Sequence, residues 1–344
     1  MITPSHTGSA KNCADLFRRR VTKWTLWMVV VFVRPEPKAT IGKLMVTSSW
    51  RRLLTRLQIH HQTTYRYRTS LEFGVHKLML RPRESRNLRL MVHELQITPA
   101  AAVTWAHDVF GNAVATAIFQ EVSDELVINS FAELDLDVEQ WPVFDIAASA
   151  ANYPFLLTED EMVDLGALRL QGYLDTCGRL RDWAQGFVAE TRTDTLALLK
   201  DICAGVATRV AYEIRESDEA QTPTQTLTSN RGSCRDFAVL FVDAVRSLGF
   251  GARIVSGYLY DPNQEAVGSE GEGSTHAWAE VYVPGAGWIV FDPTNRSVGG
   301  FNLIPVAVAR HIRQTIPVSG TFVGNQDVFE GMDVRVEVVQ AVGR

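Results

Sequence analysis

The stretch Arg231-Gly232-Ser233-Cys234-Arg235-Asp236-Phe237-Ala238 decides the fold, because it places a cysteine where a glycine-containing turn passes into a helical pattern. After Cys234, apolar residues recur at three- and four-residue steps as far as Leu248, which is typical of an amphipathic helix that ends near Gly249. Unpaired backbone N–H groups and the positive end of the helix dipole favour a thiolate in the first turn. The sequence therefore predicts a nucleophilic cysteine, with weaker help from the two flanking arginines.

A base for this thiol and a group that orients the base follow in the sequence. His276 lies in the run 274–283, where apolar and polar positions alternate as in a strand, and Asp292 ends a second such run at 288–292. The intervening Pro-Gly-Ala-Gly of 284–287 is typical of a hairpin turn. Opposite strands of one hairpin place two side chains next to each other, so the carboxylate is expected to hold the imidazole in one tautomer and to support its charged form.

Four short motifs resemble the transglutaminase-like superfamily and stand in that family's order: Gly232 to Ala238, Ser256-Gly257-Tyr258, His276-Ala277-Trp278, and Gly287 to Asn295. The resemblance covers roughly residues 195–300. It implies an α+β, papain-like core in which the helix that bears the cysteine packs on an antiparallel sheet. In that core Cys234 corresponds to the nucleophile, His276 to the general base and acid, and Asp292 to the orienting carboxylate.

Three upstream motifs resemble the N-terminal region of bacterial transglutaminase-like proteins: Leu57 to Tyr67, Leu80-Arg81-Pro82-Arg83, and Asp108 to Asn112. The resemblance implies a β-rich domain ahead of the catalytic one, and the alternating runs 59–67 and 88–97 agree with it. The expected organisation is a basic leader (1–56), the β-rich domain (57–150), a helical linker (151–194), the catalytic domain (195–300) and C-terminal strands (301–344).

Charge is distributed unevenly along the 344 residues. Residues 1–56 hold eleven Lys or Arg and two acidic residues, whereas the remainder holds 23 and 37, a net charge of −14. Because phosphate binding needs a basic stripe, an acidic body argues against nucleic acid as a main partner. We expect a protein or peptide substrate, and no cofactor or metal.

The leader contains Arg18-Arg19-Arg20 and then the apolar run 24–33, which resembles the first two parts of a secretory signal. It lacks a small-residue cleavage site, and the run is shorter than the ~20 apolar residues that a membrane-spanning helix needs. Three interpretations stay open. Translation starts at Met45 and the leader lies outside the fold, which we prefer; the leader is disordered or lies on a membrane surface; or it is an export signal. Membrane contact is expected only if the leader belongs to the working protein.

Cysteine usage favours a reducing compartment. The chain has four scattered cysteines, a poor disulfide framework for its length: Cys13, Cys177, Cys203 and Cys234. We therefore expect a cytoplasmic protein. Cys177 and Cys203 fall in stretches with helical patterns, 168–187 and 195–210, and are predicted to be small buried hydrophobic residues.

A metal site is the alternative chemistry for the same three residues, because thiolate, imidazole and carboxylate are all metal ligands. Structural zinc sites take ligands in close pairs, whereas Cys234, His276 and Asp292 are separated by 42 and 16 residues. This spacing favours the nucleophilic interpretation. The histidines of the β-rich part are expected to be structural or surface residues: His60, His61, His76, His93 and His107.

Two aromatic residues are candidates for substrate binding. Trp278 stands two residues after the predicted base, and Tyr212 precedes the nucleophile region. A place in the core is the alternative for each, and we consider it the better one for Tyr212.

The reaction follows from the predicted groups. A thiolate attacks an amide or ester carbonyl, the Cys234 backbone N–H helps to hold the oxyanion, and the intermediate collapses to a thioester. Water as the acceptor gives a peptidase or amidase, and an amine gives transamidation; the resemblance favours hydrolysis. The alternative from a different class is a non-catalytic scaffold that keeps the fold and binds proteins through the β-rich domain.

Overall fold

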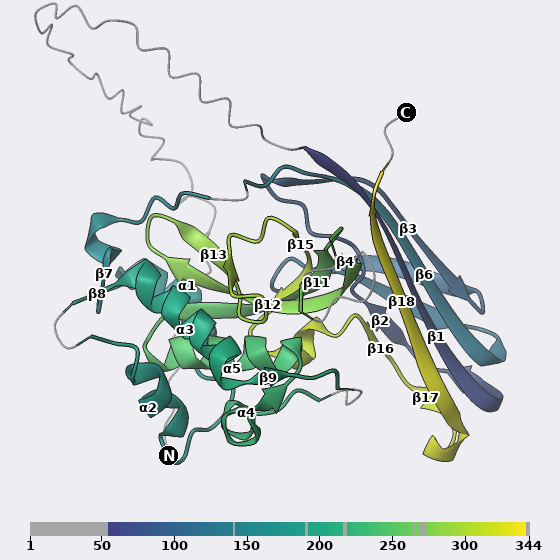
Figure 1. The fold of residues 1–344 in the computed structure, drawn as a ribbon. Coiled ribbons are helices and arrows are strands. Elements are labelled where there is room, and N and C mark those ends of the chain that lie inside the picture. Colours follow the sequence, from purple (N-terminus) through teal and green to yellow (C-terminus); the bar gives the residue numbers. More distant parts are fainter. Residues whose placement is uncertain are drawn as a thin grey trace, which may run out of the picture. The chain divides into compact units, whose positions relative to one another are not determined.

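The structure, a computed structural model, describes residues 54–139, 142–189, 192–215, 219–263, 266–267 and 273–341 (Figure 1). These residues belong to one unit, Arg51–Arg344. The predicted leader, its apolar run and the candidate start at Met45 lie outside the described residues, apart from positions 54–56. Among the described residues, no helix is long and apolar enough to cross a membrane.

An antiparallel sheet of five strands forms the centre of the second half of the chain, in the order β14-β13-β12-β11-β15. Its strands are β11 (Gly251–Tyr260), β12 (Gly273–Val283), β13 (Gly287–Asp292), β14 (Ser297–Val298) and β15 (Leu303–Ala309). The strands β12 and β13 pair from Ala279 with Phe291 to Val283 with Gly287. The predicted hairpin is confirmed, and both of its turn-side glycines adopt positive φ, Gly285 at 85° and Gly287 at 72°.

Helix α5 (Cys234–Ser247) packs on one face of this sheet, where Ala277, Ala279 and Val281 of β12 belong to its apolar cluster. The helix ends as predicted, since Gly249 takes φ 95° directly after it. Its side chains Phe237 and Phe241 are at most 1% exposed. Truncating one buried Phe costs about 3 to 5 kcal/mol, so these two rings alone anchor the helix firmly.

The remaining helices and short strands surround α5. They are β7 (Asn152–Tyr153), α1 (Glu159–Leu165), α2 (Arg179–Gln185), β8 (Thr193–Asp194), α3 (Thr195–Arg209), β9 (Ala211–Tyr212), α4 (Pro223–Ser229) and β10 (Arg231–Gly232), with 3-10 turns at Ala148–Ala150, Gly166–Arg169, Ile312–Thr315 and Gln326–Val328. The predicted helical stretch 195–210 is confirmed as α3.

The predicted helix over 168–187 is wrong for most of its length. Only Arg179–Gln185 is α-helical, because Gly178 with φ 67° begins that helix and the chain before it forms turns. Cys177 lies in these turns and is exposed, so its predicted burial is also wrong. Cys203 on α3 is 1% exposed, as predicted.

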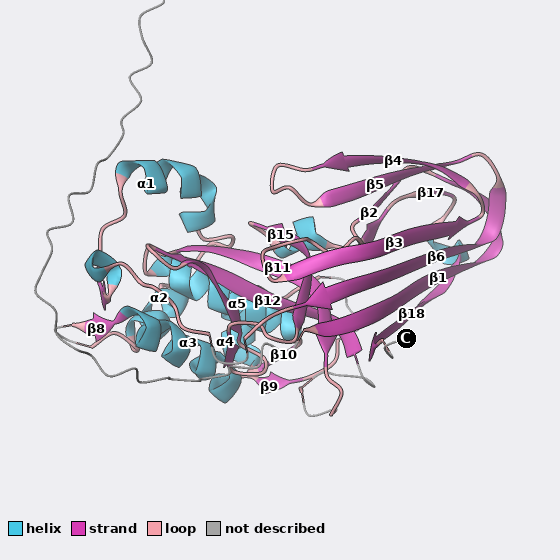
Figure 2. Cartoon of the chain, turned by 90° about the horizontal axis from the view of Figure 1, so that it is seen from above, coloured by secondary structure: helices cyan, strands magenta, loops and turns pink. Residues whose placement is uncertain are grey.

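Two further sheets form the β-rich N-terminal region, which Figure 2 shows as long neighbouring strands. The larger sheet has the order β17-β1-β6-β3 with β18 also paired to β1, and the smaller has the order β16-β2-β5-β4. Their strands are β1 (Thr55–Phe73), β2 (His76–Leu78), β3 (Leu88–Thr98), β4 (Ala101–His107), β5 (Ala113–Phe119), β6 (Val122–Leu136), β16 (Val318–Ser319), β17 (Phe322–Val323) and β18 (Phe329–Gln340). The strands expected at 59–67 and 88–97 are confirmed as parts of β1 and β3.

The C-terminal residues contribute to both halves of this unit. Strand β15 pairs with β11 in the central sheet, and β18 pairs with β1 from Leu57–Gln340 to Tyr67–Phe329. An apolar cluster joins the two sheets, with Leu57, Ile59 and Val338 on one side and Tyr258, Ile304 and Val306 on the other.

One buried polar contact crosses the same joint. His61 Nδ1 lies 2.9 Å from Tyr258 Oη, and its Nε2 lies 3.1 Å from Thr63 Oγ1. Burial lowers the pKa of His61 to about 4, so the ring is neutral at pH 7. Its two nitrogens are both occupied, which is the structural role expected for this histidine.

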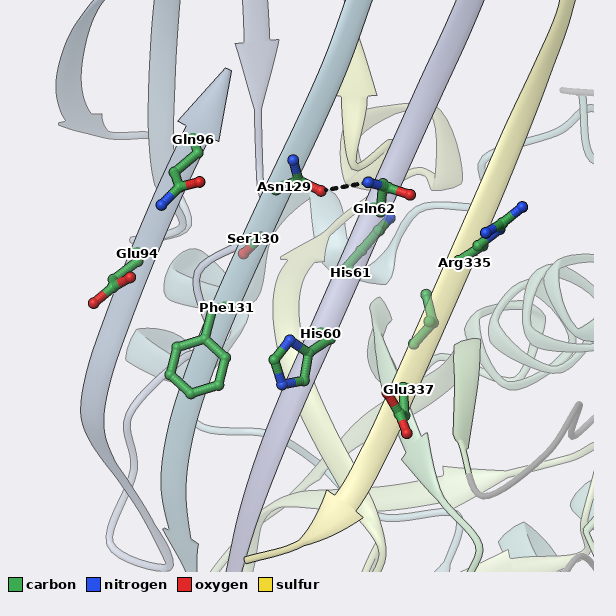
Figure 3. Close-up of a pocket in the computed structure, with 11 residues that line it drawn as sticks. His60, His61, Gln62, Glu94, Gln96, Asn129, Ser130, Phe131, Arg335 and Glu337 are labelled. Carbon is green, nitrogen blue, oxygen red and sulfur yellow. Dashed lines mark hydrogen bonds between the residues drawn. The ribbon is translucent and has the colours of Figure 1, made fainter. Parts of the chain in front are cut away.

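The outer face of the larger sheet is polar and holds a pocket of about 350 Å³ (Figure 3). Amide side chains of neighbouring strands meet in it, and Gln62 Nε2 donates to Asn129 Oδ1 over 2.9 Å. Phe131 and His60 add two rings 4.8 Å apart. Neither the predicted nucleophile nor its base or acid lines this pocket.

Candidate active site

The start of α5 is built by its own sequence. Asp236, at the third helical position, accepts hydrogen bonds through Oδ2 from the Ser233 backbone N–H (2.8 Å) and from the Ser233 hydroxyl (3.0 Å). This serine-to-acid spacing is that of a capping box. Gly232 is required beside it, because an added Cβ there would lie 2.8 Å from the Asp236 Cβ. Together these residues set Cys234 at the first position of the helix.

Asp236 also holds the segment that precedes α4. Arg215 Nη1 donates to both carboxylate oxygens at 3.1 and 3.0 Å, and the Gln221 backbone N–H donates to Oδ1 at 2.6 Å. Burial acts to raise the pKa of Asp236, but the hydrogen bonds from Ser233, Gln221 and Arg215 outweigh it and lower the pKa. The buried carboxylate is thus an anion that ties the cysteine's helix to its surroundings. The sequence prediction missed this role, although the Ser-x-x-Asp spacing signalled it.

The three predicted catalytic residues come together at the N-terminus of α5. His276 Nε2 on β12 lies 2.9 Å from Asp292 Oδ2 at the end of β13, and both side chains are 1% exposed. The Cys234 thiol hydrogen-bonds to His276 and accepts from the Ala277 backbone N–H. Because Nε2 serves Asp292, Nδ1 is the imidazole nitrogen left for the thiol. Cys234 itself is partly exposed.

Their charges support one another. Burial acts to raise the pKa of the Cys234 thiol, but the hydrogen bond and charge of His276 outweigh burial and lower the pKa. Burial likewise acts to lower the pKa of His276, and the charge and hydrogen bond of Asp292 outweigh it and raise the pKa. The arrangement favours a thiolate beside an imidazolium, which is the reactive form of a cysteine nucleophile.

Asp292 is held as an anion by the residues that follow it. Its Oδ1 accepts from the backbone N–H groups of Thr294 (3.0 Å) and Asn295 (3.3 Å), and its Oδ2 accepts from Asn295 Nδ2 (2.8 Å). These bonds, with His276, overcome burial and lower the pKa of Asp292. Asn295 is a positioning residue that the sequence prediction did not single out. It stands in the quoted motif Asp292-Pro293-Thr294-Asn295, so the signal was present.

The two predicted substrate-binding aromatic residues have different outcomes. Trp278 is 1% exposed and belongs to an apolar cluster with Val255 and Val308, so the alternative of a place in the core applies to it, and its candidacy for substrate binding is corrected. Strand alternation indicates on which face of β12 Trp278 lies, but not whether other residues cover that face. Tyr212 is partly buried and packs edge-on against Phe237, with ring centroids 6.2 Å apart. This contact places Tyr212 beside the nucleophile's helix, and its contact with substrate stays a prediction.

Other potential ligands do not extend the site. Cys203 of α3 is buried, and burial followed by the charge of Asp292 raises its pKa, so it stays a neutral thiol. Among the described residues, no group of three or more His, Cys, Asp or Glu side chains is arranged to hold a metal ion. Thr294 Oγ1 is buried without a hydrogen-bond partner next to Asp292.

Comparison with known families agrees with this geometry. A family model of the transglutaminase-like superfamily matches residues 181–293, and a model of the bacterial transglutaminase-like N-terminal region matches residues 57–135. The chain contains a transglutaminase-like core and a bacterial transglutaminase-like N-terminal region. The predicted family, with its two regions, is therefore confirmed, and Cys234, His276 and Asp292 all lie within the matched core.

Relatives of this transglutaminase-like protein match it over most of its length. An uncharacterized protein of Mycobacterium tuberculosis (strain ATCC 25618 / H37Rv) is 27% identical over 306 residues, covering 84% of this chain and 94% of the relative. An uncharacterized protein of Mycobacterium leprae (strain TN) is 24% identical over 285 residues, covering 83% and 99%. A solved candidate cysteine protease from Cytophaga hutchinsonii superimposes with a TM-score of 0.63 at 18% identity, covering 85% of this chain and 93% of that one. This last likeness establishes the predicted α+β fold.

Proposed function

We propose that this transglutaminase-like protein transfers acyl groups of peptide or amide substrates through a thioester on Cys234. The observation that carries the proposal is the continuous hydrogen-bonded chain from the Cys234 thiol through His276 to Asp292. The pKa shifts favour the charged form of each group, because His276 lowers the pKa of the thiol and Asp292 raises that of the imidazole.

The first half of the reaction forms the thioester. The Cys234 thiolate adds to the substrate carbonyl carbon, and the resulting oxyanion is held in part by the Cys234 backbone N–H at the start of α5. The imidazolium of His276 then gives its proton to the leaving amine as the carbon–nitrogen bond breaks. Asp292 remains ionised and stabilises the imidazolium throughout.

The second half of the reaction breaks the thioester and regenerates the free enzyme. Neutral His276 takes a proton from the incoming acceptor, which attacks the thioester carbonyl and releases the Cys234 thiolate. Water as the acceptor gives a carboxylic acid, and an amine gives a new amide. We favour hydrolysis, since the solved structure from Cytophaga hutchinsonii with the same fold is described as a candidate cysteine protease.

The chain contains its own controls for a labelling test. An electrophilic probe of cysteine proteases should modify Cys234 at least about tenfold faster than Cys177, because His276 activates the Cys234 thiol, although Cys177 is the more exposed of the two. The buried Cys203 should stay unmodified in the folded protein. Labelling of Cys177 ahead of Cys234 would argue for the non-catalytic scaffold. A peptide library screened for a trapped acyl group on Cys234 would then identify the substrate.

A further inference from the structure

The turn Asp108–Asn112 of the N-terminal region is unusually well fixed. Asp108 Oδ1 accepts from the backbone N–H groups of Phe110 (2.8 Å) and Asn112 (2.9 Å), and Gly111 between them takes φ 73°. Asp108 Oδ2 accepts from Asn112 Nδ2 at 2.8 Å. The turn is therefore rigid without help from the residues around it.

Asn112 fastens this turn to the central sheet. Its side chain is fully buried, its Oδ1 accepts from the Val308 backbone N–H (2.9 Å), and its Nδ2 donates to the Val308 carbonyl (2.8 Å). Arg83 Nη1 adds hydrogen bonds to Asn112 Oδ1 (2.6 Å) and to the Phe110 carbonyl (3.2 Å). Since an amide that pairs with both backbone groups of one residue has a single orientation, the turn has a defined register on β15.

Phe110 at the tip of the turn packs on the apolar cluster that contains Trp278. The indole of Trp278 in turn lies parallel to the imidazole of His276, with ring centroids 6.1 Å apart and an interplanar angle of 25°. Gly257, opposite His276 on β11, leaves room for the indole, because an added Cβ there would lie 2.8 Å from Trp278 Cη2. The base is thus backed by an indole whose apolar cluster the N-terminal region contacts through Phe110.

The turn and α5 hold β12 from opposite faces. Side chains at successive strand positions point to opposite faces, so Trp278 lies on one face while Ala277 and Ala279 lie on the other. The alanines pack in the cluster of α5, and Trp278 packs in the cluster that Phe110 contacts. The strand that carries the base is therefore fixed by the nucleophile's own helix and by a separate region of the chain.

We propose that the Asp108–Asn112 turn is a positioning element for His276, acting through Phe110 and Trp278. Without it the imidazole gains freedom to turn away from the line that joins the thiol to Asp292. The proposal rests on the proposed function, because it concerns the same base. It assigns a catalytic contribution to the N-terminal region, whose motif Asp108-Val109-Phe110-Gly111-Asn112 the mechanism otherwise leaves unused.

The test measures iodoacetamide alkylation of Cys234 against pH by mass spectrometry in the full chain. The charged and titratable groups around the pair are Asp292 from β13, Arg235 from α5 and Cys203 from α3, and none is altered. The variants are Phe110→Leu, Phe110→Val and Phe110→Ala, which remove side-chain volume in steps at a partly exposed site. Val109→Ala is the matched control, since Val109 is 93% exposed beside Phe110.

The expected result is a graded rise in the alkylation midpoint from Leu to Ala, reaching about 0.5 to 1 pH unit, with Val109→Ala equal to the parent. A merely structural role would lower the melting temperature without moving the midpoint. Equal midpoints in the parent and in all three folded Phe110 variants would overturn the proposal and leave the proposed function intact. If Phe110→Ala does not fold, the Leu and Val variants decide the matter. A parent midpoint at or above about 8.5 would contradict the proposed function, and the positioning role with it.

Discussion

His276 and Asp292 meet across the β12–β13 hairpin, with Nε2 of the imidazole 2.9 Å from Oδ2 of the carboxylate. The carboxylate in turn is held by the backbone and side chain of Asn295. An imidazole held in this way has one nitrogen committed to the acid and one available to the thiol. The His276–Asp292 pair therefore depends on a strand register and on a turn, both of which are local features of the β12–β13 hairpin and the residues that follow it.

Replacing the nucleophile separates chemistry from stability. Cys234→Ala should abolish acyl transfer and leave the melting temperature within a few degrees of the parent, because Cys234 is partly exposed and the helix start is held by Asp236. Turnover of a peptide substrate and thermal unfolding would be measured on the same preparation. Residual turnover above a small fraction of the parent rate would mean that Cys234 is not the nucleophile.

The orienting acid should matter nearly as much. Asp292→Asn should lower the rate by on the order of a hundredfold or more, because an amide neither fixes the imidazole tautomer nor stabilises its cation. Asn295→Ala removes one hydrogen bond to the carboxylate and should lower the rate less, by about tenfold, because Asn295 acts on the base only through Asp292. An Asp292→Asn variant as active as the parent, with His276→Ala inactive, would show that another group orients the base.

The capping carboxylate links stability to pH. The pKa of Asp236 is lowered in the folded state, so the unfolded chain binds more protons as the pH falls. Its contribution is thus complete above its unfolded pKa of about 3.9 and is lost as the pH falls through the lower folded value. Asp236→Asn should be less stable at pH 7 by about 3 to 5 kcal/mol, since it leaves Arg215 unpaired, and should lose less stability on acidification. Urea unfolding at pH 7 and pH 3 would measure both effects; parallel losses in parent and variant would contradict the assignment.

Much of the site was accessible from sequence because its parts are local. The glycine and serine before Cys234 and the acid after it define a capped helix start, and the alternation around His276 with the turn at 284–287 defines a hairpin. These patterns depend on neighbouring residues, whose physical chemistry does not require the rest of the chain.

The errors lie where distant residues decide the outcome. Strand alternation predicts on which face of β12 Trp278 lies, but that face is covered by residues from other strands and from the Phe110 turn, which lie far away in the sequence. The structural role predicted for His61 agrees with the structure, but its partner Tyr258 lies 197 positions away, and no local pattern signals that contact. The apolar periodicity around Cys177 predicts a helix, but Gly178, with its positive φ, begins the helix only after this residue.

The coupling of thiol and imidazole should be visible in the pH dependence of alkylation. Because the pKa of Cys234 is lowered by His276, iodoacetamide modification should be near its plateau at neutral pH and should fall only as the pH drops through the lowered value. Catalytic turnover, unlike alkylation, should also fall at alkaline pH. His276 then loses its proton, because Asp292 and the thiolate raise the pKa of His276 to about 10. In His276→Ala the alkylation midpoint should move up toward about 8.5, the value of a free cysteine, while that of the exposed Cys177 should not change. A parent midpoint at or above that value, unaffected by the substitution, would show that the two groups are uncoupled and would remove the main physical support for a cysteine nucleophile.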